Sequence, residues 1–278
     1  MTFKSEVTQG TRFEFGKNWS QFLRLLNEDR VKLAEESLLR LLEVDTLENK
    51  TFLDIGSGSG LYSLAARRLG AKVHSFDYDP QSVSCTSELK KRYFADDDDW
   101  NVESGDILNK EYLEKLGRFD IVYSWGVLHH TGDMWNAINN ASQRVKDGGQ
   151  FYLSIYNDQG GKSKRILIIK KLYNAFPNGL KWIIWMPMLL KLWWRNTVRD
   201  LIQEGKLFST WRNYAQVEAR GMSAFTDVID WVGGLPFEVA KPEEIFDFFA
   251  QKGFKLNKLK TCGGGIGCNE FVFKKSTE

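Results

Sequence analysis

Residues 51–60 read Thr-Phe-Leu-Asp-Ile-Gly-Ser-Gly-Ser-Gly, and this stretch decides the fold of the chain. Thr51–Ile55 is a short apolar run that predicts a buried strand, and Leu61–Leu69 continues with the apolar spacing of a helix. The glycines between them leave a turn without β-carbons, so a ligand can lie against bare backbone at the start of the helix. The stretch therefore predicts a strand, a turn and a helix that together hold a cofactor.

The spacing of the glycines separates two classes of cofactor. A dinucleotide fingerprint has the form Gly-x-Gly-x-x-Gly. This turn reads Gly56-x-Gly58-x-Gly60, and Leu61 stands where the dinucleotide pattern has its last glycine. Asp54, just before the turn, is unfavourable beside a pyrophosphate and favourable beside a ligand that carries an ammonium and a sulfonium. The turn therefore favours the second kind of ligand.

The chain resembles the class I S-adenosylmethionine-dependent methyltransferases, whose first motif has the form Asp-x-Gly-x-Gly-x-Gly. Segments that resemble the second strand, the adenine-side segment and the fourth strand of this family follow in order at His74–Pro80, Ser104–Ile107 and Phe119–Trp125. The resemblance covers roughly Glu43–Asn157 and the C-terminal end, and the core is similar to that of bacterial quinone-biosynthesis methyltransferases. It implies S-adenosyl-L-methionine as cofactor, S-adenosyl-L-homocysteine as product and no metal.

The resemblance also implies which residues bind the cofactor. Asp77 ends the second predicted strand, at the spacing that suits a carboxylate on ribose hydroxyls. Asp106 is expected near the adenine amino group. The complete set of expected cofactor-binding residues is Asp54, Gly56, Ser57, Gly58, Gly60, Asp77, Tyr78, Asp106, Ile107, Ser124 and Trp125.

Two of the three histidines, His129 and His130, follow the fourth predicted strand. In a doubly wound sheet this position lies at the carboxyl edge, which faces the ligand crevice. A hydroxyl acceptor benefits from a general base with a pKa near the working pH, and histidine suits this role. One of the pair is therefore a candidate base, and the alternative is a loop that only packs beside the cofactor.

The acceptor decides which further residues are needed. A carboxylate acceptor needs no base, and Arg220 is then a candidate because a guanidinium binds a carboxylate with two donors. Enzymes that methylate nucleobase amino groups carry an Asn/Asp-Pro-Pro-Tyr/Phe motif where this chain has Ser124-Trp-Gly-Val127. We therefore expect O-methylation of a small molecule or biosynthetic intermediate. The alternatives are a carboxylate on a modified peptide or glycan and, remotely, an NAD-dependent oxidoreductase.

Alternation of strands and helices predicts an α/β fold, a Rossmann-like doubly wound sheet of seven strands with an antiparallel C-terminal edge hairpin. Five strands are expected near 51–55, 72–77, 100–104, 119–124 and 149–156, and the hairpin from Phe254–Thr261 and Asn269–Lys274. We divide the chain into a helical lid (1–45), a cofactor-binding core (46–157 and 254–278) and a mainly helical insertion (158–253).

The insertion is rich in tryptophan and is expected to recognise the substrate, which makes a quinone acceptor doubtful. Its aromatic residues can form a small core or line a pocket for an apolar or extended acceptor. The segment Arg220–Glu238 reads either as a loop lining a polar pocket or as a solvated loop. The expected substrate-binding residues are Phe15, Trp19, Tyr156, Arg220 and Trp231.

Composition excludes several function classes. The net charge of +2 gives no reason to expect nucleic acid as a partner. Cys85, Cys262 and Cys268 form no close motif, which favours free thiols in a reducing compartment. Leu180–Trp194 is apolar but too short to span a bilayer and contains two lysines and a proline, so it predicts an interfacial helix or a cover over the active site. We expect a cytoplasmic enzyme, leave peripheral membrane contact open and make no prediction about oligomeric state.

Overall fold

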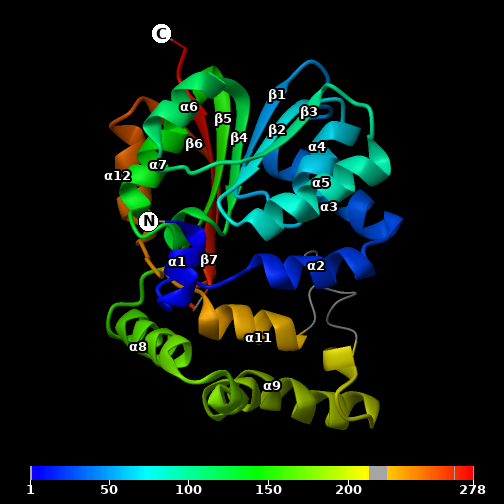
Figure 1. Cartoon of the computed structure of the whole chain (residues 1–278), viewed down its shortest axis with the longest axis vertical. Coiled ribbons are helices and arrows are strands. Elements are labelled where there is room, and N and C mark those ends of the chain that lie inside the picture. Colours follow the sequence, from blue (N-terminus) through cyan, green and yellow to red (C-terminus); the bar gives the residue numbers. More distant parts are fainter. Residues whose placement is uncertain (1, 213–223, 266, 278) are drawn as a thin grey trace.

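The computed structural model describes residues 2–212, 224–265 and 267–277. Its strands are β1 (Thr51–Ile55), β2 (Lys72–Asp77), β3 (Trp100–Ser104), β4 (Phe119–Trp125), β5 (Val145–Tyr156), β6 (Phe254–Lys260) and β7 (Cys268–Lys275). They form one sheet of seven strands in the order β3-β2-β1-β4-β5-β7-β6 (Figure 1). Strands β1 to β5 run parallel, and β7 is antiparallel to both of its neighbours. The predicted doubly wound sheet with an antiparallel C-terminal hairpin is confirmed.

Strand β5 begins earlier than the sequence predicts. Val145 pairs with Phe119 and Gln150 pairs with Ile121, so residues 146–149 bulge opposite a single residue of β4. A β-carbon on Gly149 would lie 2.8 Å from a carbonyl oxygen of that strand, so only glycine fits there. Asp147, Gly148 and Gly149 therefore belong to a bulge within the strand pair.

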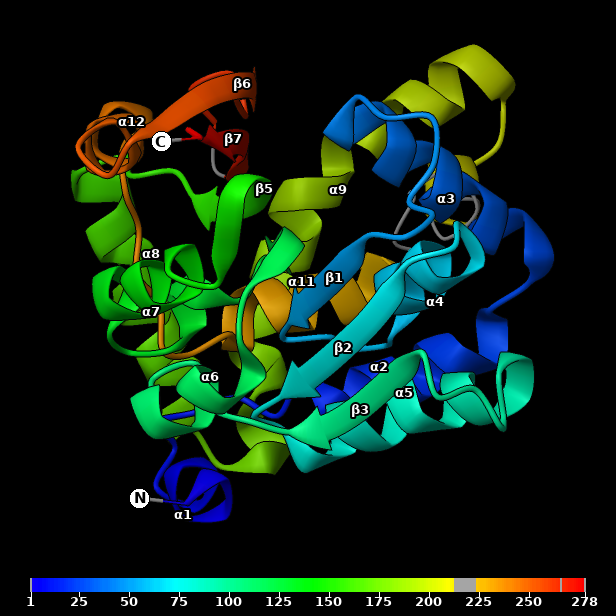
Figure 2. The ribbon, with the colours of Figure 1, turned by 90° about the horizontal axis from the view of Figure 1, so that it is seen from above.

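Helices cover both faces of the sheet, as Figure 2 shows from above. One face is covered by α3 (Glu28–Leu42), α4 (Leu61–Arg68) and α5 (Pro80–Tyr93), and the other by α6 (Lys110–Leu116), α7 (Met134–Ser142) and α12 (Pro242–Ala250). In β1, Phe52 belongs to the apolar cluster on the first face, whereas Leu53 and Ile55 belong to the cluster on the second. A strand buried on both faces reads as the continuous apolar run seen in the sequence.

Below the sheet in Figure 1 lie layers of helices that are not part of the doubly wound core. The chain begins with α1 (Phe3–Thr8) and α2 (Gly16–Leu25), which lie across the carboxyl ends of the strands. Below them lies α11 (Ala224–Gly233), with α8 (Gly161–Ala175) beside it, and α9 (Trp182–Glu204) is lowest. An apolar cluster of Tyr173, Trp193, Val228 and Val232 joins α11 to α8 and α9.

Helix α12 belongs to the core, although the sequence analysis assigns its residues to the insertion. Ile245 and Phe249 are fully buried against the sheet, where Phe249 stacks on Phe273 with ring centroids 4.1 Å apart. The chain rejoins the sheet just before this helix, because Ala240 forms a bridge with Asn157 after β5. The separate helical layers thus end at about residue 240.

The apolar segment Leu180–Trp194 begins at the last residue of the 3-10 helix η2 (Asn178–Leu180) and continues into the first part of α9, which contains Pro187. Over the ranges that the structure describes, no helix combines the length and the apolar character that a membrane crossing requires.

Candidate cofactor and acceptor site

A cavity of about 800 Å³ lies at the carboxyl edge of the parallel strands. Its floor is formed by the turn after β1, the end of β2 and the loop after β3. Its walls come from the N-terminal segment, from α11 and from η1 (Leu128–His130), the 3-10 helix after β4. Residues far apart in the sequence therefore meet around one cavity, at the place where open α/β sheets bind ligands.

The glycine turn presents bare backbone to this cavity. Gly56 and Gly58 have φ of +74° and +57°, values that favour glycine. A β-carbon on Gly58 would lie 3.0 Å from the ring of Trp19, so the turn and the lid leave little room for a side chain. Ser57 also lines the cavity, whereas Gly60 does not. Gly60 is the N-cap of α4, and a β-carbon there would lie 2.9 Å from the backbone of α5.

Two carboxylates lie behind the turn, Asp54 fully buried and Asp77 half-buried. Asp77 accepts hydrogen bonds from the backbone N–H groups of Gly58 and Asp79, both at 2.9 Å. Burial raises the pKa of Asp77 to about 6. Asp54 accepts a hydrogen bond from the hydroxyl of Ser63, and burial, with a further contribution from the Asp77 charge, raises its pKa to about 7. Among the described residues, neither carboxylate forms an ion pair with a Lys, Arg or His side chain, and this pair of acids fits a cationic ligand.

Replacing Asp54 by asparagine should stabilise the protein at neutral pH. The native pKa of Asp54 lies above the unfolded value, so its contribution to stability is largest at low pH and is lost as the pH rises to about 7. The amide of Asp54→Asn stays neutral, so the variant does not lose stability as the pH rises. We expect the variant to be more stable than the wild type by about 2–4 kcal/mol at pH 8.

Urea denaturation without ligand measures this difference. It should grow from about pH 4 to about pH 7 and level off above that value. A difference that is the same at every pH would contradict the assignment of a buried, titrating carboxylate to Asp54.

The adenine-side segment also lies at the cavity. Asp106 and Ile107 line it, and the Asp106 carboxylate accepts a hydrogen bond of 2.9 Å from the backbone N–H of Leu108, which fixes the loop after β3. Trp125 lines the cavity from the end of β4. Ser124 does not line it, because its hydroxyl is buried and donates to the carbonyl of Ile55 at 3.3 Å.

The N-terminal segment closes over the cavity and places Phe15 and Trp19 in its wall. The backbone N–H of Gly16 donates to the Asp79 carboxylate at 2.8 Å, and this bond ties the start of α2 to the start of α5. A β-carbon on Gly16 would lie 2.7 Å from that carboxylate, so glycine permits the close approach. The lid is thereby joined directly to the segment that follows Asp77.

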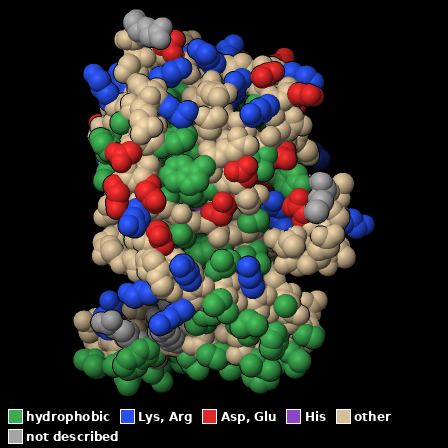
Figure 3. Space-filling view, turned by 90° about the vertical axis from the view of Figure 1, so that its left-hand side faces the viewer, with side chains coloured by type: hydrophobic (Ala, Val, Ile, Leu, Met, Phe, Trp, Pro, Cys, Tyr) green, Lys and Arg blue, Asp and Glu red, His purple; other side chains and the backbone are tan. Residues whose placement is uncertain are grey.

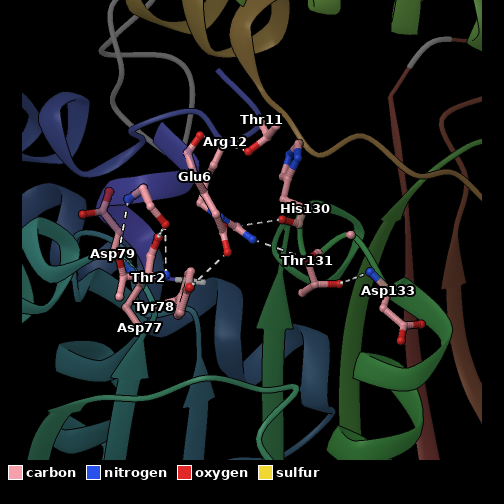
Figure 4. Close-up of polar contacts among 12 residues, drawn as sticks. Thr2, Glu6, Thr11, Arg12, Asp77, Tyr78, Asp79, His130, Thr131 and Asp133 are labelled. Atoms are coloured by element: carbon pink, nitrogen blue, oxygen red, sulfur yellow. Dashed lines mark hydrogen bonds and ion pairs between the residues drawn. The ribbon is translucent and has the colours of Figure 1, made fainter. Parts of the chain in front are cut away.

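Arg12, which the sequence analysis did not identify, joins the two sides of the cavity (Figure 4). Its guanidinium forms an ion pair with Glu6 and donates to the carbonyl groups of His130 and Thr131 at 3.0 and 3.4 Å. The Tyr78 hydroxyl donates to Glu6 at 3.2 Å, and the guanidinium lies 4.9 Å from the Tyr78 ring. The end of β2 and the histidine segment are thus connected through the N-terminus.

The two histidines line the cavity in different environments. His129 is fully buried and accepts a hydrogen bond of 3.4 Å from the backbone N–H of Tyr156. Within the described residues its Nε2 has no hydrogen-bond partner, and burial holds its pKa well below the usual range. His130 has its Nδ1 2.5 Å from the carbonyl oxygen of Pro236. Because a carbonyl only accepts, Nδ1 carries the proton, and the lone pair of neutral His130 lies on Nε2.

Helix α11 forms the wall opposite the glycine turn and contributes Asp227, Asp230 and Trp231. The amide of Asn18 donates to Asp230, which joins the lid to this helix. The sequence analysis expects a loop over Arg220–Glu238, and this is wrong for residues 224–233, which form α11, whereas residues 234–238 are neither helix nor strand. Val228 and Val232, four residues apart, form an apolar face that packs on α8 and α9. Tyr156 also lines the cavity, whereas Arg220 lies outside the described residues.

Lys170 lies behind the histidines and was not identified from the sequence. The residue is 1% exposed. Its ammonium donates to the carbonyl of Trp231 and lies 5.0 Å from the ring centre of Phe237. Burial lowers its pKa to about 7. Burial, followed by the Lys170 charge, lowers the pKa of His130 to about 3. A lysine in an amphipathic basic helix ordinarily faces water, so no signal in the sequence marks this one.

The strand order and the cavity at its carboxyl edge define the class: this is a class I S-adenosylmethionine-dependent methyltransferase. Residues 26–225 match the methyltransferase domain family, and the chain belongs to that family. The ubiquinone biosynthesis O-methyltransferases of Xanthomonas oryzae and Xanthomonas campestris are each 30% identical to it over 173 residues, which cover 60% of this chain and 70% of the relative. These relatives support a methyltransferase of small-molecule type.

Solved structures share the fold at low sequence identity. The magnesium protoporphyrin IX methyltransferase of Synechocystis, with bound S-adenosylhomocysteine, has a TM-score of 0.52 at 15% identity, and the match covers 90% of this chain and 89% of that one. An O-methyltransferase family protein of Burkholderia thailandensis has a TM-score of 0.50 at 12% identity, with coverage of 89% and 57%. Identities this low support the fold and not the acceptor.

Proposed function

We propose that the protein transfers the methyl group of S-adenosylmethionine to a hydroxyl oxygen of a small molecule or biosynthetic intermediate. The observation that carries this proposal is the orientation of His130, whose Nδ1 is held by the Pro236 carbonyl while the ring lines the cavity. The cofactor supplies an electrophilic methyl carbon on a sulfonium. The protein supplies the position of the acceptor and a site for its proton.

We assign the cofactor to the floor of the cavity. The bare turn at Gly56 and Gly58 accommodates it, Asp77 accepts hydrogen bonds from the ribose, and Asp106 lies on the adenine side. Asp54, with its raised pKa, is ionised most readily when a cationic ligand lies near it. No metal is part of this proposal.

His130 is the proposed general base. As the acceptor oxygen forms its bond to the methyl carbon, the carbon–sulfur bond breaks and the hydroxyl proton passes to Nε2. The Pro236 carbonyl stabilises the imidazolium that results, because Nδ1–H donates to it more strongly when the ring is charged. His129 is fully buried behind this ring, and we assign it to positioning rather than to proton transfer.

We call the part of the cavity between His130 and α11 its acceptor end. The charges around this end favour a hydroxyl acceptor over a carboxylate. Asp227 and Asp230 line the cavity from α11, and two carboxylates there disfavour an anionic acceptor. The name of the Xanthomonas relatives supports oxygen as the methylated atom. We place the substrate-recognition part at residues 158–240, with α12 in the core.

Binding and turnover measurements test this function. We expect calorimetric titration to give micromolar binding of S-adenosylmethionine and S-adenosylhomocysteine and none of NAD. Screens that follow S-adenosylhomocysteine release should find turnover on phenols, catechols or sugar hydroxyls. Turnover on carboxylic acids alone would contradict hydroxyl methylation, and binding of NAD alone would contradict the cofactor.

A further inference from the structure

The outer face of α9 is exposed and apolar. Exposed apolar side chains run along this 23-residue helix, at Trp182, Ile183, Met186, Leu190, Trp194, Val198, Leu201 and Ile202. Their exposed fractions range from 40% at Met186 to 77% at Ile202. Figure 3 shows hydrophobic side chains gathered at this lower end of the molecule, with Lys and Arg side chains just above them. We call this the α9 surface.

Intramolecular packing does not account for the α9 surface. The opposite side of the helix already packs against α11, through Trp193 and partly buried residues such as Trp185 and Leu189. A helix that is apolar on both sides needs a second apolar environment. The described residues supply one only on the inner side.

The charge around this surface is strongly positive. Residues 161–212 contain eleven Lys and Arg against two acidic residues, whereas the whole chain has 38 Lys and Arg against 36 Asp and Glu. One of these two acids, Asp200, is buried and accepts hydrogen bonds from Thr210. Lys162, Lys164 and Arg165 are exposed at the start of α8. The rest of the protein is correspondingly acidic, so the excess is local.

We propose that the α9 surface docks on a bilayer that contains anionic lipid, with α9 lying in the plane of the interface. Helices that bind at the headgroup level combine an apolar surface that includes exposed tryptophans with a surplus of cations. The α9 surface has both features. A second copy of this chain is a poor fit, because two such surfaces would bring their positive charges together. This inference rests on the surface alone and is independent of the acceptor.

Docking would bring the active site close to the lipid. Val228 and Val232 of α11 pack toward α8 and α9, whereas Asp227 and Trp231 of the same helix line the cavity. The α9 surface and the acceptor end of the cavity therefore lie on opposite sides of a thin helical layer.

Vesicle flotation of the full chain tests this inference. We expect the wild type to bind vesicles of phosphatidylcholine with phosphatidylglycerol, to lose binding as salt is raised, and to bind pure phosphatidylcholine weakly. Combined Leu190→Ser and Trp194→Ser should lower the partition coefficient about tenfold or more, as should combined Lys162→Glu, Lys164→Glu and Arg165→Glu.

Matched control variants change exposed residues elsewhere. Leu33→Ser with Leu259→Ser, and Lys110→Glu with Lys115→Glu, should bind vesicles like the wild type. Thermal melting by circular dichroism and cofactor titration verify that each variant is folded. The proposal would be overturned if the wild type did not bind anionic vesicles, or if the α9-surface variants bound them as well as the wild type. So would a dimer in buffer that dissociates on Leu190→Ser with Trp194→Ser and never binds vesicles.

Discussion

Asp77→Ala should lower the affinity for S-adenosylmethionine by on the order of a hundredfold, because hydrogen bonds to an ionised carboxylate are among the strongest that a ligand can lose. In the protein this carboxylate is already oriented, since Gly58 and Asp79 donate to its two oxygens at 2.9 Å. The hydroxyl groups of a ribose bound at the end of β2 would be further hydrogen-bond donors to the Asp77 carboxylate. Isothermal calorimetry with S-adenosylmethionine and S-adenosylhomocysteine measures the change.

The affinity should also depend on pH. The pKa of Asp77 without ligand is about 6, so a growing share of it is protonated below that pH and cannot accept both ribose hydroxyls. The affinity therefore falls as the pH drops through about 6. An asparagine does not titrate, so the affinity of Asp77→Asn for the cofactor should not show the decrease centred near pH 6.

Asp120→Asn is the matched control for a change at Asp77. Asp120 is a carboxylate at the opposite end of the sheet, where Lys146 at 2.8 Å and Thr51 lower its pKa to about 2. Its loss should reduce stability and leave the cofactor affinity unchanged, because Asp120 does not line the cavity. Equal affinities for Asp77→Ala and the wild type would refute the ribose assignment.

Which residues line the floor of the cavity could be predicted because short-range patterns specify them. The strand, the glycine turn and the acid at the end of β2 each depend on a few neighbouring residues. Two residues that were assigned by their position in the motif do not line the cavity. The Ser124 hydroxyl donates to a carbonyl of the neighbouring strand, and Gly60 packs against α5. A motif fixes where a residue lies along a strand, but local packing decides where its side chain points.

The walls of the cavity could not be predicted because they depend on contacts over long distances in sequence. Arg12 donates to a carbonyl 118 residues away, and Asn18 donates to an acid 212 residues away. Lys170 is buried only because α11 covers it, and the sequence of α8 gives no sign of that cover. Such contacts are set by the tertiary arrangement of the lid and the helical layers, and no local pattern records them.

His130→Gln should lower kcat on the true acceptor by about a hundredfold to ten-thousandfold, the range that a positioned general base contributes. The amide retains part of the volume of the ring but cannot take a proton. Cofactor affinity should stay near that of the wild type, because the ring lies at the wall opposite Asp77. His129→Asn is the comparison, and we expect it to affect stability more than kcat.

The pH profile separates a base from a packing residue. His130 has a pKa of about 3, so from mildly acidic to basic pH its ring is neutral, but it is a weak base while Lys170 is charged. The Lys170 charge helps to keep that pKa low, and Lys170 loses its proton above about pH 7. The proton affinity of His130, and with it kcat, should therefore rise as the pH passes 7. Lys170→Met should remove this rise by removing the charge at every pH. If His130→Gln keeps the wild-type kcat on a hydroxyl acceptor, His130 is not the base.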